Sequence, residues 1–255
     1  MLIITQHSIE SMEPNSQRLD PTKQNPWIIP LSIIISGALV GGGIFLSSRE
    51  TKTNTFTQNR QNVDTIDIAP INSEDHLIGN PNAPIVIAEF SDTECPFCKQ
   101  FHNTMKRVMD EYGKTGKVAW VYRHYPIAEL HPLAQKQAEG LECAAEIGGN
   151  TAFWNLTDAI YARGQGSPAL GTTELTELAA TFDIDSRKFS DCVTSGRMAL
   201  RVQEDMTDGE RAGARGTPYS VLITKRGEKV SINGAQPFDI VKSVIDAALA
   251  QDAVN

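Results

Sequence analysis

The sequence predicts an α/β fold, in which an all-helical insertion separates a β–α–β unit from a β–β–α unit. Three observations predict it. An apolar run at residues 85–90 leads into a helical pattern, apolar residues recur at helical spacing from about residue 131 to 211, and strand character returns at 219–224. An almost wholly apolar stretch, Ile28–Leu46, adds a transmembrane helix ahead of this fold, because about 19 apolar residues suffice to cross a bilayer.

The predicted membrane anchor lies in a segment without charged residues between Lys23 and Arg49. Trp27 stands at its edge, where tryptophans of membrane helices are common. We assign residues 27–48 to an uncleaved transmembrane anchor. The alternatives are a buried core helix and a signal peptide that is cleaved near Ala38.

The segments around the anchor are predicted from their composition. Residues 1–26 form an N-terminal cytoplasmic segment in this interpretation, and residues 49–63 are polar and form a flexible tether. Nearly all of the net charge of −8 lies after residue 50, which argues against nucleic-acid binding by the folded part.

The folded part begins with a predicted β–α–β unit. Residues 65–69 alternate polar and apolar side chains and predict a short strand, and residues 76–84 are rich in turn residues. A buried strand over 85–91, a helix over 100–112 and a strand over 117–123 follow. This order requires the last two strands to pair in parallel through a right-handed crossover.

The inserted helical subdomain is predicted over residues 131–211. Residues 148–150 and 164–168 are rich in glycine and separate its helices. Residues 172–174 and 185–187 resemble helix N-caps.

The chain closes with a predicted β–β–α unit, formed by strands at 219–224 and 229–232 and a helix at 238–249. Residues 64–130 and 212–252 therefore form one domain. The order of its elements is that of a thioredoxin-like fold interrupted in its middle.

A C-x-x-C motif, Cys95-Pro96-Phe97-Cys98, falls where the strand gives way to the helix. Unpaired N–H groups and the helix dipole at that point stabilise a thiolate at Cys95. Cys98 lies one helical turn further on and can close a disulfide, and Pro96 suits the first turn because its missing N–H costs nothing there. The motif therefore favours thiol–disulfide exchange.

Two other interpretations of the motif remain open. A C-x-x-C pair also supplies half of a zinc site, but Cys143 and Cys192 are far apart in sequence and only His102 is close. The pair could also be inert and structural.

Further motifs accompany this pair between residues 64 and 250. They are Gly79-Asn80-Pro81-Asn82-Ala83-Pro84, Glu89-Phe90-Ser91-Asp92, Arg123-His124-Tyr125-Pro126 and Gly216-Thr217-Pro218. With them the sequence resembles the DsbA family of thiol:disulfide oxidoreductases, and more closely its membrane-anchored or lipid-anchored relatives. The Pro-Phe dipeptide between the cysteines departs from the Pro-His of the best-known oxidases.

The resemblance implies a protein-disulfide oxidoreductase, with oxidase favoured over isomerase or reductase. Cys95 is the expected nucleophile and Cys98 its redox partner. The resemblance places a cis Pro218 against Cys95 and pairs the Thr217 backbone with an extended substrate, whereas spacing alone also allows a trans proline. It also places Glu89 beneath the cysteines, where it moves a proton to or from Cys98. The alternative is an exposed glutamate at a strand edge.

Five other residues near these motifs have weaker interpretations. Phe97 is a substrate contact or a simple packing aromatic. We assign no role to His102 or His124, and we expect Asp92 and Glu94 to be solvated and to oppose the Cys95 thiolate slightly.

Cys143 and Cys192 are predicted to form a structural disulfide inside the insertion, because packed antiparallel helices can bring them together and four cysteines leave an even pair. Two separate buried free cysteines are the alternative.

Because disulfides persist outside the cytoplasm, we expect a single-pass protein of the inner membrane whose catalytic domain faces the periplasm or extracellular side. Expected partners are reduced or misfolded exported proteins and a membrane redox partner that reoxidises (or reduces) the Cys95–Cys98 pair. No nucleic acid, cofactor or metal is expected. The alternative function is a chaperone-like or surface binding protein without catalysis, which binds unfolded segments beside Pro218.

Overall fold

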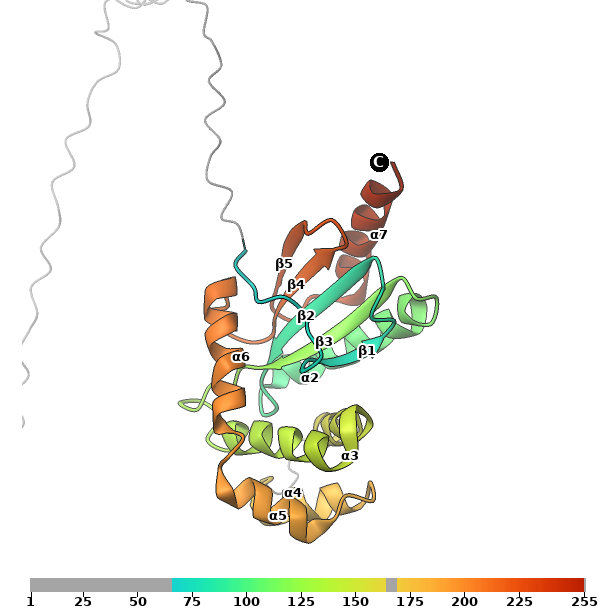
Figure 1. Cartoon of the computed structure of the whole chain (residues 1–255). Coiled ribbons are helices and arrows are strands. Elements are labelled where there is room, and N and C mark those ends of the chain that lie inside the picture. The colour runs from blue at the N-terminus through green and yellow to red at the C-terminus, as the bar shows by residue number, and fades with distance from the viewer. Residues whose placement is uncertain (1–65, 164–168, 255) are drawn as a thin grey trace, which may run out of the picture. The chain divides into compact units, whose positions relative to one another are not determined.

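The structure is a computed structural model, and it describes residues 66–163 and 169–254 (Figure 1). The predicted cytoplasmic segment, anchor and tether, residues 1–63, lie outside the described residues. Among the described helices, none combines the length and the apolar character that a bilayer span requires.

A five-stranded sheet forms the centre of the described fold, in the order β1-β3-β2-β4-β5. Its central strands β2 and β3 pair in parallel, as predicted, and the other neighbours are antiparallel. The strands are β1 (His76–Gly79), β2 (Ile85–Ser91), β3 (Val118–His124), β4 (Tyr219–Thr224) and β5 (Lys229–Asn233). Strand β2 is buried on both faces, and its apolar side chains join the two apolar clusters of the fold.

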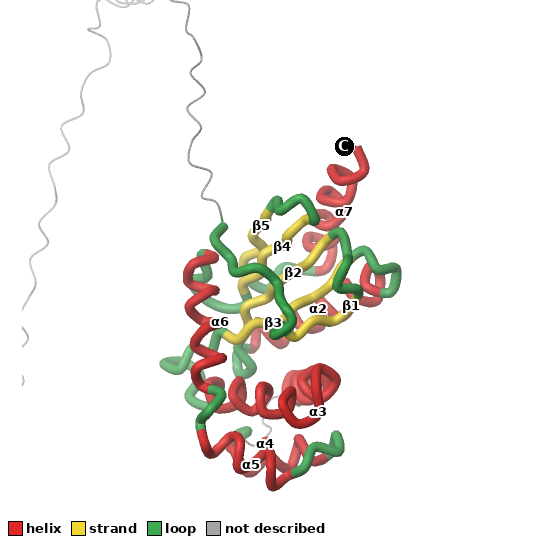
Figure 2. Tube along the Cα trace, in the orientation of Figure 1, coloured by secondary structure: helices red, strands yellow, loops and turns green. Residues whose placement is uncertain are grey.

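The helices divide between the sheet and the insertion (Figure 2). They are α2 (Pro96–Val108) with its π-helical extension η2 (Met109–Gly113), α3 (Ala134–Ala162), α4 (Thr172–Ala180), α5 (Ser186–Ser195), α6 (Ala199–Ala212) and α7 (Phe238–Val254). Helices α2 and α7 share one apolar core with the sheet, in which Phe101 and Ile245 join Trp120. Figure 1 shows α3, α4 and α5 gathered beyond one end of the sheet, with α6 running back along it.

The insertion between β3 and β4 is all-helical, and α6 packs closely on the sheet. A Cβ atom added at Gly209 of α6 would lie 2.7 Å from the Tyr125 ring and 2.9 Å from the Phe90 ring. Only glycine therefore allows the helix to approach β2 and the loop after β3 at this distance.

The strand predicted at residues 65–69 is wrong, because the described residues 66–69 form no strand and the edge strand β1 lies later, at His76–Gly79. The backbone groups here bond to side chains instead of a ladder. The N–H of Ala69 donates to Asp208 (2.7 Å) and its carbonyl accepts from Arg123 (3.2 Å). The alternating Ile66 and Ile68 pack on the second apolar core, which explains the strand-like pattern.

Helix boundaries in the insertion agree only partly with the predicted ones. The predicted break at residues 148–150 is confirmed, because the non-helical backbone angles of Gly149 (φ 71°, ψ −171°) divide α3 into two helical segments. Asp185 caps α5 as predicted by accepting from the Lys188 N–H (2.9 Å), whereas the N-cap of α4 is Gly171. The predicted break at residues 164–168 lies outside the described residues.

Candidate active site

The two cysteines of the C-x-x-C motif occupy different environments at the start of α2. Cys95 is the N-cap residue, with extended backbone angles (φ −71°, ψ 121°), and Pro96 opens the helix. Both thiols are free. Cys98 is wholly buried and its Sγ accepts a hydrogen bond from the Asp92 N–H (3.4 Å), while Cys95 is 5 % exposed and the intervening Phe97 is 61 % exposed.

The two thiols at the start of α2 have opposite pKa shifts. A hydrogen bond from the Cys98 thiol, together with the backbone N–H groups of Cys98 and Phe97 and a contribution from Thr217, lowers the pKa of Cys95 to about 5 against the opposing effect of burial. Burial, and the charge on Cys95, raise the pKa of Cys98 well above its usual value. At neutral pH, Cys95 is therefore a thiolate and Cys98 a thiol.

Pro218 and Thr217 lie against the first cysteine. The Thr217–Pro218 peptide bond is cis, and Pro218 directly precedes β4. The Cys95 Sγ is 3.5 Å from the Thr217 carbonyl oxygen, which accepts a hydrogen bond from the thiol form. The fold thus brings the Thr217 carbonyl to Cys95 across 122 residues of sequence, and the bond before Pro218 is cis, as the resemblance implied.

Glu89 of β2, six residues before Cys95, is wholly buried. The alternative of an exposed glutamate at a strand edge is therefore wrong. Its two carboxyl oxygens accept hydrogen bonds from the Ser91 hydroxyl (2.7 Å) and the Trp120 indole N–H (3.0 Å). Burial raises the pKa of Glu89 to about 7, because it outweighs these two hydrogen bonds. A carboxyl group with this pKa exchanges protons readily at neutral pH.

Ser91 connects Glu89 to the second cysteine, and sequence reasoning missed it. Its hydroxyl donates to Glu89 (2.7 Å), and the nearby Ser91 side chain partly opposes the rise in the pKa of Cys98. The Tyr161 hydroxyl, from α3, lies 3.0 Å from the Ser91 hydroxyl and 3.1 Å from that of Tyr122. The alternation of β2 offered a signal, because Glu89 and Ser91 share one face of the strand. Nothing in the sequence pointed to Tyr161, 70 residues away.

The sequence profile of the thioredoxin family matches residues 72–247, which is more than half of the chain. The chain belongs to this family. Among solved structures, DsbA2 from Pseudomonas aeruginosa shares 28% identity with a TM-score of 0.60, over 73% of this chain and 100% of that one. Two others show the same fold. Alpha-DsbA1 from Wolbachia pipientis is 21% identical with a TM-score of 0.63, over 72% of this chain and 95% of that one. Oxidised BdbD from Bacillus subtilis is 17% identical with a TM-score of 0.63, over 73% of this chain and 98% of that one. The family is therefore the DsbA-like branch of the thioredoxin fold.

The curated relatives of this DsbA-like chain are longer proteins. It is 32% identical over 152 residues to the Na(+)/H(+) antiporter NhaA 3 of Salinispora tropica, and 31% identical over 177 residues to NhaA 1 of Salinispora arenicola. It spans 22% of the first and 25% of the second, about a quarter of their length or less. Antiport activity therefore belongs to those longer proteins and is not assigned to this chain.

The expectation that Asp92 is solvated is wrong for this DsbA-like site, since the side chain is 1 % exposed. One of its oxygens accepts from the Ile127 N–H and from His131 Nδ1 (both 2.8 Å). Glu94, half-buried, accepts from the Leu133 N–H (2.8 Å). Both carboxylates are held by the loop between β3 and α3, which is distant in sequence, so the local pattern gave no signal of their burial.

The two histidines considered in the sequence analysis, His102 and His124, form hydrogen bonds with carboxylates and not with the Cys95 thiol. His102 is buried in α2 against the rings of Trp120 and Tyr161, and its Nε2 lies 2.6 Å from Asp158. His124 contacts Glu142 of α3 instead.

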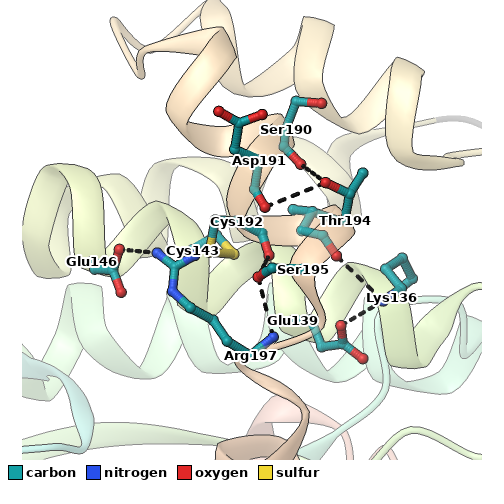
Figure 3. The surroundings of a disulfide bond; sticks show 11 residues. Lys136, Glu139, Cys143, Glu146, Ser190, Asp191, Cys192, Thr194, Ser195 and Arg197 are labelled. Carbon is teal, nitrogen blue, oxygen red and sulfur yellow. Dashed lines mark hydrogen bonds and ion pairs between the residues drawn. A yellow bond between two sulfur atoms is a disulfide. The ribbon is translucent and has the colours of Figure 1, made fainter.

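Cys143 of α3 and Cys192 of α5 are joined by a disulfide, with 5.9 Å between their Cα atoms (Figure 3). Two ion pairs lie beside it, from Arg197 to Glu146 and from Lys136 to Glu139. The bond joins α3 to α5 through two cysteines that are 49 residues apart in the sequence.

Proposed function

We propose that the protein is a thiol:disulfide oxidoreductase that forms or exchanges disulfides in exported proteins through the Cys95–Cys98 pair. The observation that supports this best is the contrast between the two thiols. Cys95 combines a pKa of about 5 with a position at the helix start beside Thr217, whereas Cys98 is buried and keeps its proton. Such a pair has one nucleophile or leaving group that faces the substrate and one resolving thiol.

In the oxidising direction the reaction starts from the Cys95–Cys98 disulfide. A substrate thiolate attacks the Cys95 sulfur, a mixed disulfide forms, and the bond to Cys98 breaks. A second substrate thiolate then attacks the substrate sulfur of the mixed disulfide, and Cys95 leaves as a thiolate. Two electrons have passed from the substrate to the cysteine pair, and the substrate gains a disulfide.

Cys98 needs a proton when it leaves, because its thiol has a pKa well above the usual value. We assign this proton to Glu89, whose pKa of about 7 keeps roughly half of it protonated near neutral pH. The Ser91 hydroxyl carries it: Ser91 gives its own proton to Cys98 and takes one from Glu89. The reverse path removes the proton when the pair is reoxidised.

Oxidase activity is favoured over isomerase or reductase activity. A stable Cys95 thiolate stabilises the reduced form of the pair, so the disulfide form is the stronger oxidant. Turnover then requires a membrane redox partner that accepts the two electrons.

We further propose that the catalytic domain faces the periplasm or extracellular side, anchored by residues 27–48. The Cys143–Cys192 disulfide supports this location, because such bonds persist in oxidising compartments. Membranes washed with alkaline carbonate should retain the intact chain, and external protease should reach the folded part. A mature chain that starts near Ala38 would contradict the anchor.

The decisive experiment measures disulfide formation in a reduced, unfolded test protein with the full chain as catalyst. Cys95→Ser should abolish turnover, and Cys98→Ser should accumulate the mixed disulfide. If Cys95→Ser keeps the full effect of the unsubstituted chain on the test protein, the alternative of a non-catalytic chaperone-like protein is correct instead.

A further inference from the structure

A second cluster of buried polar side chains lies where β1, β3, α3 and α6 meet, and the proposed thiol chemistry does not use it. His76 of β1 and His124 of β3 each place Nε2 3.0 Å from Oε1 of Glu142, which belongs to α3. Asp205 of α6 accepts a hydrogen bond from the backbone N–H of His124 (2.9 Å). All four side chains are buried.

We propose that His124, Glu142 and Asp205 form a binding site for a divalent transition metal, with Zn²⁺ as the ion that fits best. One ring nitrogen and one oxygen from each carboxylate lie within 4.8 Å of one another. Ligand atoms in a tetrahedral site with bonds of about 2.1 Å are roughly 3.4 Å apart. No pair of these donors is therefore more than about 1.4 Å wider apart than such a site requires.

An unsatisfied nitrogen supports the proposal independently. Among the described residues, Nδ1 of His124 is buried without a hydrogen-bond partner. Buried polar atoms are nearly always paired, and an exception calls for a missing ion or water. His124 can use one ring nitrogen toward Glu142 and still offer the other, and a metal bond to either nitrogen fixes the tautomer.

The donor set selects the class of metal. An imidazole with two carboxylates suits zinc and its neighbours in the transition series, whereas Ca²⁺ and Mg²⁺ prefer oxygen ligands alone. His76 is not one of the proposed ligands. Its Nε2 lies 3.0 Å from Oε1 of Glu142 and orients that carboxylate toward the metal. Asp205 can ligate while it accepts from His124, because a carboxylate offers about four lone-pair positions.

A surface cavity reaches one of the three proposed ligands, Asp205. A cavity of about 130 Å³ is lined by Asp205, Arg201, Arg123 and Asp208 among others. Arg201 pairs with Asp205 from one helical turn away, and its side chain is 21% exposed. It can therefore turn toward solvent and leave the carboxylate to the metal without a change in the backbone.

A metal here would join α3 and α6 of the insertion to the central sheet. The sequence predicted no metal site because the ligands are dispersed, with Glu142 18 residues and Asp205 81 residues from His124. No ligand-spacing motif links them, and only the fold brings them together.

The test uses the full chain without an affinity tag and with Cys95→Ser and Cys98→Ser, because thiolates and polyhistidine bind Zn²⁺ themselves. Titration with ZnCl₂ should give one bound ion per chain and, at about 100-fold excess over Kd, a Tm increase of about 5–10 °C. Glu142→Gln and Asp205→Asn should each weaken binding more than about tenfold, and His76→Asn by about 10-fold to 100-fold. His102→Asn, which alters a buried histidine outside the cluster, is the matched control and should leave the affinity unchanged.

A second measurement needs no ligand variant and covers the case that these variants do not fold. Added Zn²⁺ should shift the ¹⁵N resonances of the His124 ring in the otherwise unsubstituted protein. Absence of binding, unchanged His124 resonances, full affinity in both carboxylate variants, or a preference for CaCl₂ over ZnCl₂ would each overturn the proposal.

Discussion

The acidity of Cys95 should make the stability of the reduced protein depend on pH between 5 and 7. The folded pKa of Cys95 is about 5 and the ordinary value is 9.0. A thiol whose pKa falls on folding stabilises the folded state above its folded pKa, and this stability is lost as the pH falls through about 5. The oxidised protein has no such thiol, so the difference between the two forms isolates the effect.

The magnitude follows from the two pKa values. At pH 7 the thiolate contributes about 2.7 kcal/mol to the folding of the reduced protein, and at pH 5 about 0.4 kcal/mol. Cys98 adds nothing in this range, because its raised pKa leaves it protonated in both states. We therefore expect the stability of the reduced form, relative to the oxidised form, to rise by about 2 kcal/mol from pH 5 to pH 7.

Urea unfolding of both redox forms at several pH values measures this difference, and alkylation of the reduced protein across the same series locates the thiol. Cys95 should be labelled before Cys98, with a midpoint near 5. Cys98→Ala should raise that midpoint, because the Cys98 thiol contributes most to the low pKa. Glu89→Gln controls for the other group that titrates nearby. A pH-independent stability difference, or preferential labelling of Cys98, would refute the assignment of the nucleophile.

Three further substitutions test the remaining parts of the site and its support. Glu89→Gln should stabilise the protein at pH 7 by up to about 3 kcal/mol, because a carboxyl group whose pKa rises on folding destabilises the folded state at pH values above its unfolded pKa. The substitution should also remove an ionisation near pH 7 from the pH–rate profile of disulfide exchange. An unchanged profile would exclude Glu89 as the proton donor. Ser91→Ala should slow disulfide exchange without moving the Cys95 alkylation midpoint, while Ser91→Thr should restore much of the rate; equal rates in both would exclude the hydroxyl. Joint replacement of Cys143 and Cys192 by alanine should lower the unfolding free energy by about 4 kcal/mol for a loop of 49 residues, and an unchanged Tm would contradict a structural role.

The parts of the site that are local in sequence could be predicted, and the parts that depend on distant segments could not. The strand at 85–91 and the helix after it are confirmed, because periodicity marks a buried strand and a proline marks the first turn. The position of Cys95 at the helix N-cap follows from the same local pattern. Asp92 escaped prediction because the groups that bury it, Ile127 and His131, lie 35 and 39 residues further along the chain.

The strand predicted at 65–69 shows the opposite error, in which a local pattern was present but had another cause. Alternation reports only that every second side chain is buried, and Ile66 and Ile68 are packed in this way without a strand. The backbone there bonds to Asp208 and Arg123, which are side chains far away in sequence. A single sequence does not show such distant side-chain partners. The real edge strand, His76–Gly79, falls in the segment 76–84, for which the sequence predicts turns.

Helix α3 of the insertion contributes the Tyr161 hydroxyl to the proton path that we propose for the cysteine pair. The Tyr161 hydroxyl donates to the Asp92 carbonyl and contacts the Ser91 hydroxyl, so it orients the group to which we assign proton transfer between Glu89 and Cys98. Glu89 costs about 3 kcal/mol at neutral pH, and a fold that keeps it buried needs compensation elsewhere. The disulfide between α3 and α5 contributes about 4 kcal/mol on the chain-entropy model, and its Cys143 lies in α3, on the other side of the Gly149 break from Tyr161. In the proposed mechanism the insertion therefore positions Ser91 through Tyr161, and its disulfide offsets the destabilisation that the buried Glu89 of β2 imposes.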